Sequence, residues 1–225
     1  MTPDVPALPI VHGLKARALA AVYNPRPAPV VLPFPTRRAV LFDFVAKTIG
    51  DVPLTYLEFG VHQGVSMHMI GKLFTNPASR FHGFDSFEGL PESWGNKGPG
   101  HFSTEGAAPR MEDPRVTFIK GWFQNTLPQF LATEKPGGSV LVQFDADVYS
   151  ATLFLLTTLW HHIPAYYFMF DEFVPSEVVA FYDFSLAYPV EVEFLAARSD
   201  EYAQPGQVFG RLRNTAYQPP MTTGP

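Results

Sequence analysis

The chain has 225 residues, of which 46% are hydrophobic and 16% are charged, so it is long and apolar enough to bury the core of one large domain. Sixteen Lys and Arg residues against 21 Asp and Glu give a formal net charge of −5, which excludes the broadly basic surface of a nucleic-acid-binding protein. Cysteine is absent, so disulfides, thiolate metal sites and a cysteine nucleophile are excluded as well. No apolar run approaches the roughly 20 residues of a membrane helix, and the acidic, proline-broken N-terminus is unlike a signal peptide. We therefore predict a cytoplasmic protein with no nucleic-acid or membrane partner.

Residues 1–36 form a proline-rich N-terminal arm, with eight of the 23 prolines of the chain before residue 36. Proline fixes φ and removes a backbone donor, so most of this arm is predicted to be neither a regular helix nor a central strand. Residues 13–23 are the exception, because they are rich in helix-forming residues. We expect a solvated or partner-packing extension, and the alternative is a lid over a site or a strap exchanged in a homodimer. Residues 216–225 are predicted to be a flexible C-terminal tail.

Short apolar runs alternate with helical stretches over residues 37–215, which are predicted to be the main domain. Apolar side chains recur at helical spacing in residues 37–50 and 65–74, and residues 153–161 are a third predicted helix. Strand–helix alternation predicts an α/β fold with a doubly wound, mostly parallel, seven-stranded sheet and an antiparallel C-terminal hairpin strand. The predicted strands are residues 54–59, 81–84, 116–119, 139–144, 166–170, 190–197 and 207–212.

Residues 91–114 interrupt this alternation with a polar segment rich in Gly and Pro. The segment exceeds ordinary connection lengths, so it is either a functional loop or a disordered one. It follows the strand at 81–84, on the side where ligands bind in such sheets. Trp94 and Phe102 are its candidates for covering a substrate.

The first candidate motif lies where the strand at 54–59 passes into the helix at 65–74. Glu58 ends the strand, and Gly60 and Gly64 bracket a tight turn in which glycine permits close backbone approach. The helix that follows offers free N–H groups to an anion, and Ser66 can cap it. The spacing is not that of the dinucleotide fingerprint, so by itself the motif is equally a structural turn.

The second candidate is Asp85, at the end of the strand at 81–84 and 25 residues after Gly60. An acid at this position accepts hydrogen bonds from a ribose diol in nucleotide-binding α/β folds. The alternative is a helix N-cap. The pairing of a glycine turn with a following acid favours nucleoside binding.

Four carboxylates follow two further strands. Asp145 and Asp147 come directly after residues 139–144, and Asp171 and Glu172 come directly after residues 166–170. Like charges this close raise one another's pKa values unless a cation neutralises them, and a hard divalent cation with oxygen ligands does so well. Zinc is disfavoured, because cysteine and paired histidines are lacking. The alternative is that these acids face water in loops.

Together these motifs resemble a class I S-adenosylmethionine (SAM)-dependent methyltransferase, and more narrowly the macrocin O-methyltransferase (TylF-like) family, which methylates hydroxyls of sugars and related natural products. The resemblance extends over roughly residues 37–213. It is carried by LEFGVHQGVS, by FHGFDSFEGLPESW, which is the most specific stretch, and by FDADVYSAT followed by FMFDEF.

The resemblance implies a role for individual residues of this chain. Asp147 would be the general base, with Asp145 beside it in the catalytic pair. Mg²⁺ would be bound by Asp145, Asp171 and Glu172. The cofactor would be held by Glu58, Gly60, Val61, His62, Gly64, Ser66, Asp85, Ser86, Phe87, Gly121, Trp122 and Asp145.

The expected activity is a Mg²⁺-dependent transfer of a methyl group from SAM to a hydroxyl of a small-molecule acceptor, either a sugar or another natural product. Catechol-type acceptors suit the same metal chemistry. A nucleotide-dependent oxidoreductase is one alternative, although its Gly-x-Gly-x-x-Gly motif is missing and it has no use for four carboxylates. A non-catalytic SAM-binding protein that uses the proline-rich arm for assembly is the other.

Overall fold

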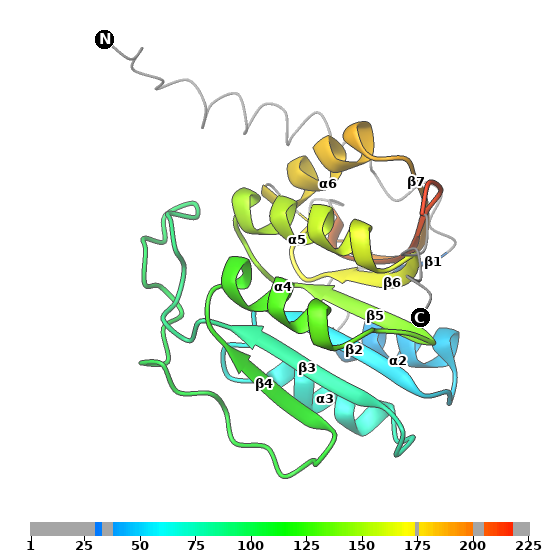
Figure 1. Cartoon of the computed structure of the whole chain (residues 1–225), viewed down its shortest axis with the longest axis horizontal. Coiled ribbons are helices and arrows are strands. Elements are labelled where there is room, and N and C mark those ends of the chain that lie inside the picture. Colours follow the sequence, from blue (N-terminus) through cyan, green and yellow to red (C-terminus); the bar gives the residue numbers. More distant parts are fainter. Residues whose placement is uncertain (1–29, 33–37, 174–175, 200–204, 218–225) are drawn as a thin grey trace, which may run out of the picture.

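The computed structural model describes residues 30–32, 38–173, 176–199 and 205–217. In it, the apolar runs of the sequence form the strands of one eight-stranded sheet (Figure 1). The strands are β1 (Val30–Leu32), β2 (Leu54–Phe59), β3 (Arg80–Asp85), β4 (Val116–Lys120), β5 (Ser139–Phe144), β6 (Ala165–Phe170), β7 (Val190–Ser199) and β8 (Pro205–Asn214). The helices are α2 (Arg38–Ile49), α3 (Val65–Leu73), α4 (Phe123–Thr133), α5 (Tyr149–His162) and α6 (Ser176–Ala187).

The order of the strands is β1-β7-β8-β6-β5-β2-β3-β4. Strand β8 runs antiparallel to both of its neighbours, β6 and β7, and every other pair of neighbours is parallel. The chain leaves β2 toward β3 on one side and later returns to β5 on the other, so the strand order reverses between β2 and β5. Ligands of doubly wound sheets bind at the carboxyl ends of the strands beside such a reversal.

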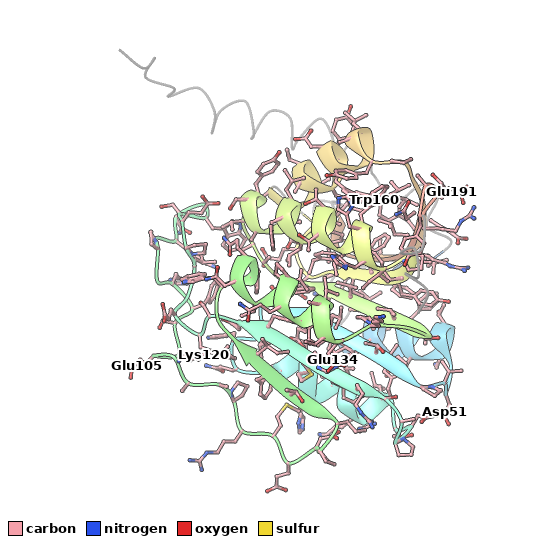
Figure 2. The ribbon with its side chains drawn as sticks, viewed as in Figure 1. Asp51, Glu105, Lys120, Glu134, Trp160 and Glu191 are labelled. Carbon is pink, nitrogen blue, oxygen red and sulfur yellow. The ribbon has the colours of Figure 1, made fainter. Side chains whose placement is uncertain are left out.

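Two helical layers cover the sheet. Helices α4, α5 and α6 pack on one face, and α2 and α3 pack on the other (Figure 1). Side chains fill the space between each layer and the sheet (Figure 2). Successive residues of a strand point to opposite faces, so Tyr56 and Leu141 belong to the core beneath α2 and α3, whereas Leu57 and Val142 belong to the core beneath α4 and α5.

The strand register aligns four strand ends at one edge of the sheet. Phe59 is level with Phe84 of β3 and with Phe144 of β5, and Phe144 is level with Phe170 of β6. Their rings stack, with centroids 4.8 Å apart for Phe59 and Phe84 and 4.6 Å apart for Phe144 and Phe170. Each residue that follows one of these phenylalanines therefore leaves the sheet at the same edge.

All seven predicted strands are present, and β2 and β5 have the predicted bounds. The eighth strand, β1, comes from the proline-rich arm and pairs with β7 at the edge of the sheet. On α2, Leu41, Phe42 and Val45 are buried, whereas Val40 is 42% exposed.

Helices α4 and α6 were not predicted from the sequence. Pro128 lies inside α4 and disfavours a helix, but the packing of Leu127 and Phe130 against the sheet compensates for this cost. Helix α6 is apolar on several sides, with Val178, Val179 and Phe181 all buried, so it lacks a helical hydrophobic period.

Two predicted features, the helix at 13–23 and the tail beyond residue 217, lie outside the described residues. Within the described ranges, no helix has both the length and the apolar character needed to cross a membrane.

Candidate active site

A tight turn joins β2 to α3 at the aligned edge of the sheet. Gly60 has a φ of +97°, and a Cβ atom on it would lie 1.9 Å from the carbonyl oxygen of Asp145. Only glycine permits this approach of two backbones. Gly64, with a φ of +75°, forms the N-cap of α3. The glycine-bracketed turn predicted from the sequence is therefore required by the backbone geometry.

Asp85 holds this turn in place. Its Oδ2 atom accepts hydrogen bonds of 2.8 Å from the backbone N–H groups of Val61 and His62, and its Oδ1 atom accepts one of 2.7 Å from Phe87. Asp85, which the sequence predicts to bind a ribose, therefore also fixes the turn between β2 and α3 and the segment that follows β3. Hydrogen bonds to a charged acceptor are among the stronger ones in proteins, so the arrangement is well fixed.

Glu58 lies beneath the turn and is fully buried. The hydroxyl of Ser66, in the first turn of α3, donates a hydrogen bond of 2.6 Å to its Oε1 atom. Burial raises the pKa of Glu58 to about 8, although the hydrogen bond from Ser66 acts in the opposite direction. The carboxyl group is therefore largely neutral at pH 7.

A cavity of about 410 Å³ opens above the aligned strand ends, within the size range of small-molecule sites. Glu58, Gly64 and Phe87 do not line it, since they support the turn and the following loop from outside the cavity. The predicted site residues that line it are Gly60, Val61, His62, Ser66, Asp85, Ser86, Gly121, Trp122, Asp145, Asp147, Asp171 and Glu172.

Other lining residues were not in the predicted set. They are Gln63, Val65, Gly89, Leu90, Pro91, Lys97, Phe123, Gln124, Ala146, Ser150 and Ala151, and they are joined by Trp94 and Phe102, the predicted covering residues. Gln63, Val65, Ala146, Ser150 and Ala151 are close neighbours in sequence of predicted site residues. The others reach the cavity through the fold of the segment after β3 and through the start of α4, which was not predicted.

Asp147 is half-buried in the turn before α5, with a φ of +62°. Burial raises its pKa to about 7, and the negative charges of Glu172 and Asp171 act in the same direction, whereas the positive charge of Lys97 lowers it. A carboxylate with a pKa near neutrality can accept a proton in one step and release it in the next.

Asp171, at the end of β6, is linked by hydrogen bonds to the neighbouring strands β8 and β7. The buried side-chain amide of Gln207 donates a hydrogen bond to Oδ1 of Asp171. Arg198, on β7, in turn donates a hydrogen bond of 3.3 Å to the oxygen of the same amide. These contacts fix the orientation of a carboxylate that lines the cavity.

The donor chemistry of Asp145, Asp171 and Glu172 suits Mg²⁺, and all three line the cavity. However, in the part of the chain that the structure describes, no group of three or more His, Asp or Glu side chains is close enough together to hold a metal ion. The residues predicted as metal ligands thus share an edge of the sheet without forming the predicted site.

The predicted loop at 91–114 folds against the cavity. Lys97 lies between two aromatic rings, with its ammonium 4.2 Å from the ring centre of Trp94 and 4.3 Å from that of Phe102. The hydroxyl of Ser150, on α5, donates a hydrogen bond of 2.7 Å to Glu92 of the loop. Among the cavity-lining residues that the structure describes, Lys97 carries the single lysine or arginine side chain.

Comparison with known proteins finds a family match over the middle of the chain. Residues 57–166 match the family described as "Methyltransferase domain", and this range holds the glycine turn, Asp85 and Asp147. Comparison with curated proteins found no match.

Several solved structures share the fold. CalS11, described as a TDP-rhamnose 3′-O-methyltransferase of calicheamicin biosynthesis, is 20% identical and has a TM-score of 0.51, over 91% of this chain and 93% of its own. The O-methyltransferase NovP is 20% identical with a TM-score of 0.50, over 89% and 97%. An O-methyltransferase from Bacillus cereus in complex with SAH is 14% identical with a TM-score of 0.53, over 90% of each chain.

The fold is therefore the Rossmann-like α/β fold of methyltransferases, with its antiparallel C-terminal strands. The matched domain and the structural neighbours support a class I SAM-dependent methyltransferase.

Proposed function

We propose that this protein is a SAM-dependent O-methyltransferase in which Asp147 is the general base for a hydroxyl of a small-molecule acceptor. The observation that carries the proposal is the position of Asp147, whose pKa is raised to about 7 and which lines the same cavity as the glycine turn. General bases work best when their pKa lies near the working pH. We also propose that the protein is a member of the TylF-like family and that it acts in natural-product biosynthesis.

The cavity fits the cofactor. Its volume suits a ligand of this size, and its acidic lining, which includes Asp85 and Asp145, suits a cation. The turn from Gly60 to Gly64 would hold the methionine portion, Asp85 the ribose, and Trp122 the adenine. When bound, SAM supplies a methyl group on a positively charged sulfur. Mg²⁺ dependence stays a prediction from the sequence.

The residues of the chain have two tasks in this reaction. The walls of the cavity must hold the acceptor hydroxyl in line with the methyl group, because alignment supplies much of the rate enhancement of such a displacement. Asp147 must accept the hydroxyl proton at a carboxylate oxygen as the new oxygen–carbon bond forms. Aromatic side chains, including Trp94 and Phe102, would cover the acceptor and exclude water.

A sugar hydroxyl is the acceptor class that we propose. It is supported by the acceptor named for CalS11, which this chain resembles in fold at 20% identity. Trp94 and Trp122 both line the cavity, and their side chains provide apolar surface against which a sugar ring can pack.

Calorimetry and product analysis test the proposed function. S-adenosylhomocysteine should bind to the full-length protein, whereas NAD should not. Mass spectrometry should then detect one added methyl group on a member of a panel of sugar nucleotides, glycosides and catechols. Binding of NAD with no binding of S-adenosylhomocysteine would overturn the assignment in favour of the oxidoreductase alternative. Cofactor binding without a methylated product from any panel member would favour the non-catalytic alternative.

A further inference from the structure

Asp147 lies in a strained turn. The backbone N–H of Val148 donates a hydrogen bond of 2.6 Å to the carbonyl oxygen of Ala146, two residues earlier, and Asp147 between them has a φ of +62°. A three-residue turn with a positive central φ is rare and costs energy for a residue other than glycine. Such a conformation persists only where surrounding contacts enforce it.

Both ends of this turn are held by regular structure. The backbone N–H of Asp145 donates a hydrogen bond of 2.9 Å to the carbonyl oxygen of Phe59 in β2. At the other end, the N–H of Thr152 in α5 donates one of 3.1 Å to the carbonyl oxygen of Val148. Neither contact restrains the middle of the turn, where Ala146 precedes the strained residue.

Glu177 supplies the contact in the middle. It lies in the first turn of α6, is 1% exposed, and accepts a hydrogen bond of 3.3 Å from the backbone N–H of Ala146 at its Oε1 atom. Its Oε2 atom is buried and has no hydrogen-bond partner within the described residues. Burying a carboxyl group is costly, and an apolar residue would fill this position in α6 with less loss of free energy. The contact with Ala146 explains why a carboxyl group lies there.

We propose that Glu177 is a positioning residue, which holds the turn from Asp145 to Val148 in the conformation that presents Asp147 to the cavity. Helix α6 is thereby coupled to the reacting groups across 31 residues of sequence. This inference rests on the proposed role of Asp147. The proposal predicts that removal of the Glu177 carboxyl oxygen makes the turn more mobile but leaves the binding of the cofactor unchanged.

Two substitutions of Glu177 separate positioning from general stability. Glu177→Leu removes the acceptor oxygen, and Glu177→Gln keeps a carbonyl oxygen at the same place. Ser79→Ala is the matched control, because the Ser79 hydroxyl oxygen, also buried, accepts a hydrogen bond of 3.0 Å from the backbone N–H of Leu54 at the opposite end of β2. Each variant is examined by hydrogen–deuterium exchange of the peptide spanning residues 145–148 and by calorimetry with S-adenosylhomocysteine.

In Glu177→Leu we expect amide exchange in residues 145–148 to become about tenfold faster, because one hydrogen bond is lost. Affinity for S-adenosylhomocysteine should stay within about twofold, and Glu177→Gln should restore slow exchange. Ser79→Ala should leave exchange in this peptide unchanged. Unchanged exchange in Glu177→Leu, or fast exchange in Glu177→Gln as well, would overturn the proposal.

Turnover distinguishes this proposal from the one on which it rests. With an acceptor that is methylated, Glu177→Leu should lower kcat by about tenfold to a hundredfold while KM for SAM is unchanged, because the base is misplaced. If Asp147→Asn turns over normally, the proposed function of Asp147 is wrong. If Asp147→Asn is inactive but Glu177→Leu turns over normally, the positioning role alone is wrong.

Discussion

The hydroxyl of Ser66 donates a hydrogen bond of 2.6 Å to the buried carboxyl group of Glu58, which ties the first turn of α3 to the end of β2. Because burial raises the pKa of Glu58 from 4.5 to about 8, the native protein keeps a proton here that the unfolded chain releases between these two pH values. Deprotonation therefore favours the unfolded state across this window. The free energy of unfolding should fall as pH rises from about 4.5 to 8, by up to about 1.4 kcal/mol per pH unit from this one group.

Glu58→Gln tests this linkage, because glutamine is neutral in both the folded and the unfolded state. Urea unfolding at pH 5, 6, 7 and 8 should show a shallower loss of stability for Glu58→Gln than for the wild-type protein. Glu134→Gln, which changes an exposed carboxyl group at the end of α4 (Figure 2), should keep the wild-type slope. Equal slopes for Glu58→Gln and the wild-type protein would contradict the raised pKa.

Gly60→Ala should disrupt the site through a backbone clash. The added Cβ atom would meet the carbonyl oxygen of Asp145 at 1.9 Å, so β2 and β5 would have to separate, at a cost of at least about 3 kcal/mol. Gly50→Ala is the control, because Gly50 also has a positive φ, of +80°, but has nothing within 4 Å of the position of a Cβ atom. It should cost only about 1 to 2 kcal/mol in thermal or urea unfolding. Similar losses for the two variants would show that the clash is relieved.

Asp147→Asn should retain the fold and the cofactor site but lose proton transfer. We expect kcat to fall by about 10²- to 10⁴-fold, with affinity for S-adenosylhomocysteine within about twofold of the wild-type value. Asp51→Asn changes an exposed acid just before β2, at the opposite edge of the sheet (Figure 2), and should change neither quantity. Near-normal methylation by Asp147→Asn would remove this residue from the mechanism.

Lys97→Met should move the pH dependence of turnover. Asp147 must be deprotonated to act as a base, so kcat/KM should rise with pH around an apparent pKa of about 7 in the wild-type protein. The positive charge of Lys97 lowers the pKa of Asp147, and its removal should therefore shift the rise to higher pH. Lys97→Arg, which keeps the charge, should retain the wild-type profile. A rise at the same pH in Lys97→Met would show that the charge of Lys97 does not act on the base.

Chelation tests the predicted role of Mg²⁺. Because Asp145, Asp171 and Glu172 line the cavity and offer the oxygen ligands that Mg²⁺ prefers, the sequence predicts that methyl transfer is lost in EDTA, and unchanged turnover would contradict this prediction. The comparison is made between protein dialysed against EDTA and the same protein after addition of Mg²⁺, with turnover and melting temperature as measurements. Loss of turnover in EDTA and its recovery with Mg²⁺ would show that these carboxylates rearrange around an ion, as the sequence predicts.

The sequence by itself determined the order of strands β2 to β8 and of helices α2, α3 and α5, together with the edge of the sheet at which the candidate site lies. Residues 54–59 and 139–144 were recognisable as strands because each is a run of six residues bounded by turn residues, which is shorter than most helices. Parallel strands end at a common edge, so the residues that follow them, such as Asp145 and Asp171, could be assigned to one site without knowledge of the contacts.

Only the tertiary structure decided what those residues do to one another. The hydrogen bonds from Val61 and His62 to Asp85, the pKa of Asp147 and the support of its turn by Glu177 depend on contacts between segments far apart in the chain. The packing of the sheet likewise selected the helix around Pro128, against its local preference. Sequence spacing reports local periodicity, whereas burial and the convergence of charges arise only when distant segments pack together, and these set the chemistry of the site.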